Sequence, residues 1–249
     1  FHHGNDVVAT IQNQTFSMNV SQCNKFVIPT SGIVSRYKKH YSNVNRISPS
    51  CTEFLSVNSR KMYDLYLKNL NNSINKHVET VMLIGYPFNA NRYVGGRGLF
   101  FYQQVDLEYR LISLLKSENK RVIYKAHPER LKEIEGVFDA VVDEIIVEPF
   151  EGVWNKADLL LFTYSSTTTF GYALTTNIPI ILLDSEHEMR DKDDMLLLDK
   201  RVSRVFANIS HNTRISFDKE SLVDAMTRST EDISFDYVKD IYKESYIAE

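Results

Sequence analysis

The chain has 249 residues, of which 43% are hydrophobic and 24% are charged, so it can bury one large core or two smaller ones. The formal net charge is −3 at pH 7, and Lys and Arg are scattered along the chain; without a basic stripe, a general nucleic-acid binder is excluded. Two cysteines, Cys23 and Cys51, are too few for a disulfide scaffold and indicate a reducing compartment or at most one disulfide bridge. No apolar run is long enough to cross a bilayer.

The first 75 residues are polar, rich in Asn and Ser, and only weakly periodic. KFVIPT, residues 25–30, predicts one short strand. Residues 53–70, with Tyr and Leu at helical spacing, predict a helix. The chain begins with Phe1 instead of Met, so we expect it to be part of a longer protein.

From about residue 76, apolar runs alternate with amphipathic segments. Continuous Val, Ile and Leu runs between helices are typical of a parallel sheet that is covered on both faces. The sequence therefore predicts an α/β fold with a Rossmann-like half. The expected strands are 80–88, 120–128, 157–166 and 178–184, and residues 135–149 are expected to form a short helix or loop and then a strand. The expected helices are 100–119, 167–177, 221–229 and 235–246.

A run of hydroxyl residues follows one of these strands and precedes a helix. Ser165, Ser166 and Thr167 begin this run of five. In an open parallel sheet, ligands bind outside the carboxyl ends of the strands, and a helix N-terminus there favours an anion. One hydroxyl is enough to cap the helix, so the length of the run favours phosphate binding over capping alone.

A second polar stretch, KAHPER (residues 125–130), stands at the end of the strand expected at 120–128. Pro128 disfavours helix at the preceding residue, which holds His127 at the strand end. His127 can donate a hydrogen bond to a phosphate or move a proton near neutral pH, and Lys125 adds positive charge. An isolated His would be expected only to stabilise a turn, but a hydroxyl run on the same edge of the sheet favours a shared phosphate pocket.

Two further segments carry charge but give weaker signals. Arg97 lies among Gly95, Gly96 and Gly98, in a loop that could grip a phosphate or simply be flexible. The acidic run at 190–195 lies in a charged, solvated stretch, and His2 with His3 is too small a cluster for a metal site. We therefore expect no metal.

The combination resembles a known family. A His-Pro after one strand, followed by an apolar strand that ends in Ser-Ser before a helix, is similar to bacterial GT-B glycosyltransferases of surface-polysaccharide assembly. This group includes CDP-glycerol glycerophosphotransferases, capsule Kdo transferases and polysialyltransferases. His3-Gly4 also resembles the His-Gly element of the CDP-glycerol enzymes. The resemblance covers residues 76–185 well and the first few residues loosely.

The resemblance implies a metal-independent transferase that moves a sugar, or a polyol phosphate, from a nucleotide-activated donor, with CMP- or CDP-linked donors favoured and no separate cofactor. His127 would contact the donor phosphate and His3 would act as a base or on the acceptor side. The residues implied to bind the donor are Lys125, Pro128, Glu129, Ser165, Ser166, Thr167 and Arg97. The helix after the Ser pair lacks the carboxylate that many GT-B enzymes use to hold a ribose, and the carboxylates that could replace it are Glu148, Glu151 and Asp184.

The resemblance also implies an organisation and a location. Residues 1–75 would be the remnant of an N-terminal, acceptor-side domain with a linker helix. Residues 76–225 would form the Rossmann-like nucleotide-sugar-binding domain, and 226–249 a C-terminal helix that packs back. The acceptor would be a glycan or a lipid-linked glycan on the bacterial surface, handled in the cytoplasm or peripherally at the inner face of the cytoplasmic membrane.

Two alternatives remain open at this point. A catalytically silent GT-B-like module would bind a nucleotide or a glycan, or would only scaffold a partner. A UDP-sugar 2-epimerase would use the same fold, but it needs more carboxylates around the pocket than the sequence provides.

Overall fold

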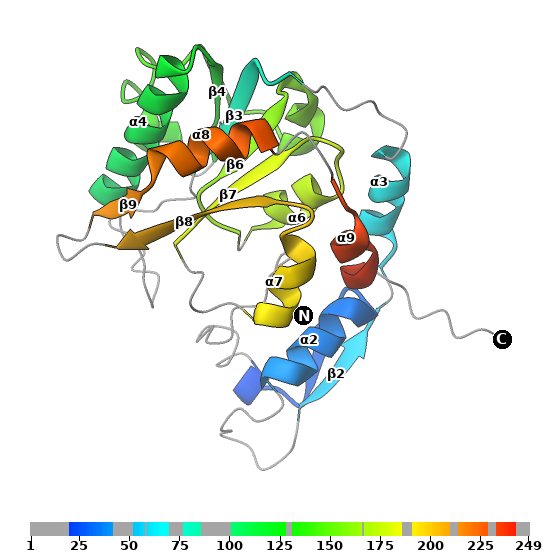
Figure 1. Ribbon diagram of the computed structural model, residues 1–249. Helices are drawn as coiled ribbons and strands as arrows, with labels where there is room; N and C mark the ends of the chain where they lie inside the picture. Colours follow the sequence, from blue (N-terminus) through cyan, green and yellow to red (C-terminus); the bar gives the residue numbers. More distant parts are fainter. Residues whose placement is uncertain are drawn as a thin grey trace.

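The computed structural model describes residues 20–41, 52–57, 59–69, 77–85, 101–127, 131–165, 167–185, 191–209, 214–228 and 233–242. Its centre is a seven-stranded sheet that alternates with helices, as expected for an α/β, Rossmann-like chain (Figure 1). The strand order is β5 (Glu144–Ile146), β4 (Arg121–Lys125), β3 (Thr80–Ile84), β6 (Leu159–Phe162), β7 (Ile180–Asp184), β8 (Ser203–Ile209) and β9 (Ile215–Phe217). All neighbouring pairs are parallel except β8 and β9.

Both faces of this sheet are covered, which explains why its central strands are apolar at successive positions. Val81 and Leu83 face one core with α4 (Phe101–Ser117) and α8 (Lys219–Arg228). Met82 and Ile84 face the other core with α6 (Thr168–Leu174) and α7 (Lys192–Leu198). The remaining connections are α5 (Leu131–Ile134) and two 3-10 turns, η2 (Phe150–Gly152) and η3 (Trp154–Lys156).

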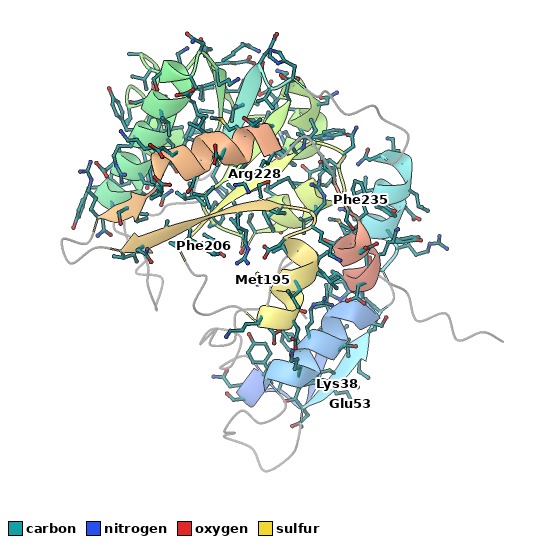
Figure 2. The ribbon with its side chains drawn as sticks, viewed as in Figure 1. Lys38, Glu53, Met195, Phe206, Arg228 and Phe235 are labelled. Carbon is teal, nitrogen blue, oxygen red and sulfur yellow. The ribbon has the colours of Figure 1, made fainter. Side chains whose placement is uncertain are left out.

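A smaller unit lies at one end of the molecule (Figure 1). It consists of β1 (Lys25–Ile28), α2 (Ser31–Tyr41) and β2 (Glu53–Ser56), and the two strands pair in parallel. Figure 2 shows Lys38 of α2 and Glu53 of β2 on this unit, and both residues are exposed. The helix α3 (Lys61–Asn69) follows β2 in the sequence.

The sequence-based prediction was correct for β1 but wrong for residues 53–70, which are not one helix. Glu53–Ser56 is the strand β2, and the helix α3 begins only at Lys61. The strand forms because Phe54 is buried between β1 and α2, where Phe26 and Tyr37 contact it. Tertiary packing thus overrides a local pattern that also fits a helix.

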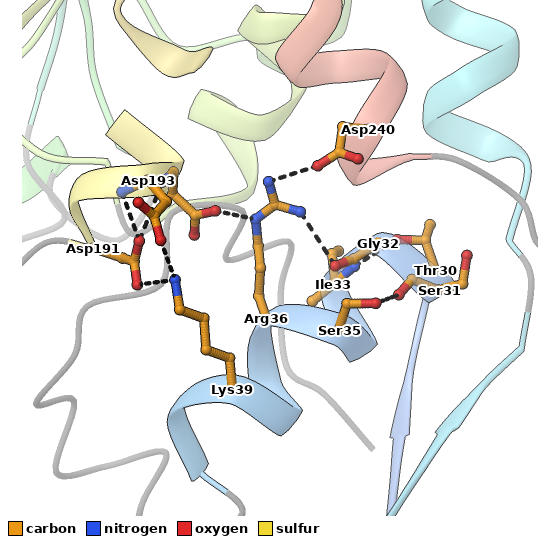
Figure 3. A network of polar contacts seen from close by, with 11 residues as sticks. Thr30, Ser31, Gly32, Ile33, Ser35, Arg36, Lys39, Asp191, Asp193 and Asp240 are labelled. Carbon is orange, nitrogen blue, oxygen red and sulfur yellow. Dashed lines mark hydrogen bonds and ion pairs between the residues drawn. The ribbon is translucent and has the colours of Figure 1, made fainter. Parts of the chain in front are cut away.

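The small unit is held to the sheet by α7 and by α9 (Asp236–Ile241) (Figure 3). Arg36 of α2 pairs with Asp194 at 3.0 Å and with Asp240 at 2.9 Å. Lys39 pairs with Asp191 at 2.7 Å and with Asp193 at 2.9 Å. We call this contact between α2, α7 and α9 the junction.

At the junction, the backbones of α2 and α9 also approach closely. Gly32 lies at this close approach, and a Cβ at this position would collide with the carbonyl oxygens of Asp240 and Ile241. Thr30 donates its hydroxyl hydrogen to the Ile241 carbonyl at 2.5 Å. In the described residues, no helix is long and apolar enough to cross a membrane.

Candidate functional site

The order of the large sheet reverses at β3. The chain first adds β4 and β5 on one side of β3 and then returns to place β6 on its other side. This order corresponds to the 3-2-1-4-5-6 arrangement of doubly wound sheets, in which ligands bind at the carboxyl ends of the strands where the order reverses. The carboxyl ends of β3, β4 and β6 are therefore the place to look for a site.

A cavity of about 180 Å³ lies at this place. Its wall contains Ile84 and Gly85 at the end of β3 and residues 125–127 at the end of β4. Residues 149–151, Tyr164 and Thr169 also line it. The volume suits one small charged group and part of what it carries better than a whole drug-sized ligand.

Lys125 is the buried cation of the cavity. Only 6% of its surface is exposed, and its Nζ donates a hydrogen bond to the Ala126 carbonyl at 2.7 Å. Burial lowers the pKa of Lys125, while the charges of Glu148 and Glu151 act in the opposite direction. A desolvated ammonium of this kind gains stability when an anion arrives beside it.

His127 lines the same cavity, two residues further along, and is half-buried. Its position is set by the strand, because the Ala126 N–H still donates to the Ile146 carbonyl of β5 at 2.9 Å. The structure therefore brings together Lys125 and His127, which the sequence had singled out from KAHPER.

The hydroxyl residues divide into different environments. Thr167 is the N-cap of α6, and its Oγ1 accepts a hydrogen bond from the Thr169 N–H at 3.3 Å. Ser165 is fully buried, and its hydroxyl has no hydrogen-bond partner within the part of the chain that the structure describes. Thr169 lines the cavity, whereas Ser165 and Thr167 are not part of its wall.

Of the three carboxylates considered as ribose ligands, Glu151 alone is part of the described cavity wall. Asp184 is buried at the end of β7 and pairs with Arg204 at 3.3 Å. Glu148 is exposed, and its carboxylate accepts from the Val147 N–H at 3.1 Å. Glu151 is exposed at the cavity mouth, where it can accept hydrogen bonds from hydroxyl groups.

Some expected site residues lie outside the described residues, namely His3, Arg97, Pro128, Glu129 and Ser166. Other residues of the cavity were missed by the sequence analysis. Tyr164 stands inside the Thr-Tyr-Ser-Ser stretch and could have been found as the residue two positions after the strand end. Gly85 could likewise have been found from its position directly after β3. Nothing in the sequence around Phe150 indicates that it is part of the cavity wall.

The acidic run after residue 190 has a structural task. Asp191 is the N-cap of α7 and accepts hydrogen bonds from the N–H groups of Asp193 and Asp194. Burial alone would raise the pKa of Asp191, but the hydrogen bonds from Lys39 and from these N–H groups hold it below its usual value. Across the described residues, no group of three His, Cys, Asp or Glu side chains could hold a metal ion.

Comparison with known proteins adds no relative to this picture. No family model, no curated protein and no solved structure matches the chain. The functional argument therefore depends on the strand order, the cavity and the charges around it.

Proposed function

We propose that the protein is a metal-independent glycosyltransferase of the GT-B type. It would transfer a sugar, or a polyol phosphate, from a nucleotide-activated donor to a bacterial surface glycan. The observation that carries the proposal is the cavity at the strand-order reversal, whose wall combines the desolvated Lys125 with His127. In doubly wound sheets, nucleotide phosphates bind at this position.

The charges of the cavity wall support a phosphate ligand. The Lys125 ammonium makes no ion pair in the described part of the chain, so its charge is available to a ligand. The imidazole of His127 adds a hydrogen-bond donor on the same wall. Charge-assisted hydrogen bonds from such groups are about twice as strong as neutral ones.

The reaction then divides between donor and acceptor. The bond between the transferred group and the donor phosphate breaks, and its electron pair leaves on the phosphate oxygen, where Lys125 and His127 stabilise the charge. The acceptor hydroxyl oxygen forms the new bond, and its proton passes to a base, for which His3 is the candidate. Protein donors would take the place that a metal ion has in other transferases.

Glu151 is suited to the part of the donor beyond the phosphate. A carboxylate beside a bound phosphate would repel it, so Glu151 is better explained by hydroxyl groups, from which it can accept hydrogen bonds. A ribose or a transferred sugar offers such groups. This assigns to Glu151 the ribose contact for which helix α6 has no carboxylate.

The proposal extends to the organisation of the chain. Residues 76–225 would be the nucleotide-binding domain, residues 1–75 part of the acceptor-side domain, and residues 226–249 the helix that returns to it. The contact of α9 with α2 and α3 supports this division. A cytoplasmic reaction, with the enzyme free or at the inner face of the membrane, follows from the same proposal.

A thermal-shift screen tests the donor pocket. CMP, CDP, UDP and GDP are compared on wild type, His127→Ala and the control His77→Ala, which changes an exposed histidine at the opposite end of β3. Binding to the native state raises the Tm by mass action. We expect one nucleotide, CMP or CDP, to stabilise wild type and His77→Ala but not His127→Ala.

The alternatives give different results. A well-folded wild type that no nucleotide stabilises contradicts the transferase and favours a silent module. A sugar nucleotide that is converted without any acceptor favours the epimerase.

A further inference from the structure

On the face of the sheet that α4 covers, directly behind the cavity, hydrogen bonds connect buried polar side chains across neighbouring strands. Glu108 of α4 is fully buried. One of its carboxylate oxygens accepts from the Tyr124 hydroxyl at 2.7 Å, and the other accepts from Gln104 Nε2 at 3.0 Å. Gln104 Nε2 also donates to Thr163 Oγ1 at 3.1 Å. We call these four residues the α4 brace.

The brace reaches the ends of three strands. Tyr124 belongs to β4, and Thr163 directly follows β6. Between them lies β3, whose following residue, Gly85, packs against the tyrosine: a Cβ on Gly85 would collide with the Tyr124 hydroxyl. The brace therefore spans the place where the strand order reverses and where the cavity opens.

Each of these three contacts adjoins a residue of the cavity wall. Lys125 follows Tyr124, Tyr164 follows Thr163, and Gly85 is itself part of the wall. Successive residues of a strand point to opposite faces. A shift of Tyr124 or Thr163 toward or away from α4 thus moves Lys125 or Tyr164 with it.

The hydrogen bonds of the brace are incomplete. The Gln104 carbonyl oxygen is buried and has no hydrogen-bond partner within the described segments. A buried acceptor without a partner costs stability, and such costs concentrate at functional sites. An apolar contact between α4 and the sheet, as Leu107 and Leu111 make, would avoid this cost.

We infer that the α4 brace is a positioning device for the donor pocket. It fixes the spacing of the ends of β3, β4 and β6, and with it the positions of Lys125 and Tyr164 in the cavity wall. The inference rests on the proposed nucleotide binding. Glu108, Gln104, Tyr124 and Thr163 are positioning residues and touch no ligand themselves.

The test compares isosteric variants of the full chain by calorimetric titration with CMP, CDP, UDP and GDP. Tyr124→Phe and Thr163→Val each remove one hydroxyl of the brace and keep the side-chain shape. Matched controls are Tyr237→Phe, a fully buried tyrosine of α9, and Thr176→Val, which removes a buried hydroxyl that donates to the Ala173 carbonyl at 2.7 Å. All four variants are expected to lower the Tm.

Affinity separates positioning from stability. We expect each brace variant to raise the Kd of the bound nucleotide roughly fivefold, while the controls stay within the error of wild type. The double variant should raise the Kd little more than either single one, because both changes release the same brace. Thr163→Ser, which keeps the hydroxyl, should bind like wild type.

The outcomes are distinguishable. If wild type binds a nucleotide and the brace variants bind as well as the controls, the brace inference is wrong and the proposed function stands. If wild type binds none of the four nucleotides, both are wrong.

Discussion

The junction and the cavity both bury charged side chains, but among the described residues of these two regions only the charges of the junction form ion pairs. Arg36 and Lys39 contact four aspartates there, three of them around the start of α7. At the cavity, the Lys125 ammonium binds a backbone carbonyl, and within the described residues it makes no ion pair.

This difference distinguishes charges that stabilise the folded structure from charges that can bind a ligand. Burial alone would lower the pKa of Arg36, but Tyr237, Asp194 and Asp240 raise it above its ordinary value. Burial does lower the pKa of Lys125, because the charges of Glu148 and Glu151 offset only part of its effect. A buried charge without a partner is a cost in the free protein that a bound anion removes.

The largest loss of stability is expected when a side chain is introduced between α2 and α9. Gly32→Ala puts a methyl group against two backbone carbonyls that cannot rotate away, so it should lower the free energy of unfolding by about 3 kcal/mol or more. Urea unfolding measures this loss. Gly152→Ala is the control, because nothing lies within 4 Å of a Cβ there, and it should leave the stability nearly unchanged. A Gly32→Ala protein as stable as this control contradicts the close approach.

A smaller loss is expected when a junction ion pair is broken. Arg36→Met removes the guanidinium that pairs with the largely buried Asp194 and should cost about 2 kcal/mol, less than a fully buried pair because Asp240 remains half exposed. Changing Asp194→Leu in the same chain should recover part of the loss, since no uncompensated charge then stays buried. Equal stability of Arg36→Met and wild type would show that the pair contributes nothing.

At the cavity, the corresponding substitution should act in the opposite direction. Lys125→Met removes a desolvated charge, so the free energy of unfolding should stay constant or rise by about 1 kcal/mol. The same variant should bind the nucleotide at least about tenfold more weakly, since a charge-assisted contact is lost. Unfolding curves and titration on one preparation give both values. A strongly destabilised Lys125→Met protein would place Lys125 with the structural charges of the junction.

The smallest expected effect concerns how the stability of the protein and the proposed nucleotide binding depend on pH. Because the folded-state pKa of Lys125 lies below that of the unfolded chain, the unfolded state binds more protons between the two values, and Lys125 adds stability as the pH rises through the lowered pKa. The proposed nucleotide binding would need the protonated form and should weaken over the same alkaline range, below the ordinary lysine pKa of about 10.4. Titration in buffers of different ionisation enthalpy should show proton uptake on binding there. Lys125→Met should show none.

Much of the large sheet could be predicted, because strands that are buried on both faces have continuous apolar sequences. The strands at 80–84, 121–125, 159–162 and 180–184 were found in this way. β8 was missed because Ser203–Ile209 mixes polar and apolar residues, as fits a strand whose Phe206 points to solvent. α2 was missed because its buried face is fixed by β2, the next element in the sequence, and by α9, which is distant in the sequence.

The site was predictable to the extent that it lies at strand ends. Lys125 and His127 follow an apolar run directly, so their place needed only the strand. The choice of Glu151 over Asp184 needed the path of the chain after β5, which local sequence does not give. Gln104 and Glu108 look like the solvent side of a helix until α4 is placed on the sheet.

The contact between Thr30 and Ile241 joins residues that are 211 positions apart. During synthesis, β3 to β8 can pair as they emerge, since each forms a parallel neighbour with a strand nearby in the sequence. The small unit precedes the sheet in the sequence but must wait for α9, which follows the sheet, before its helix α2 has a partner for Gly32. Contacts of such long range form late and slowly, so the small unit is expected to gain protection from proteases later than the large sheet does.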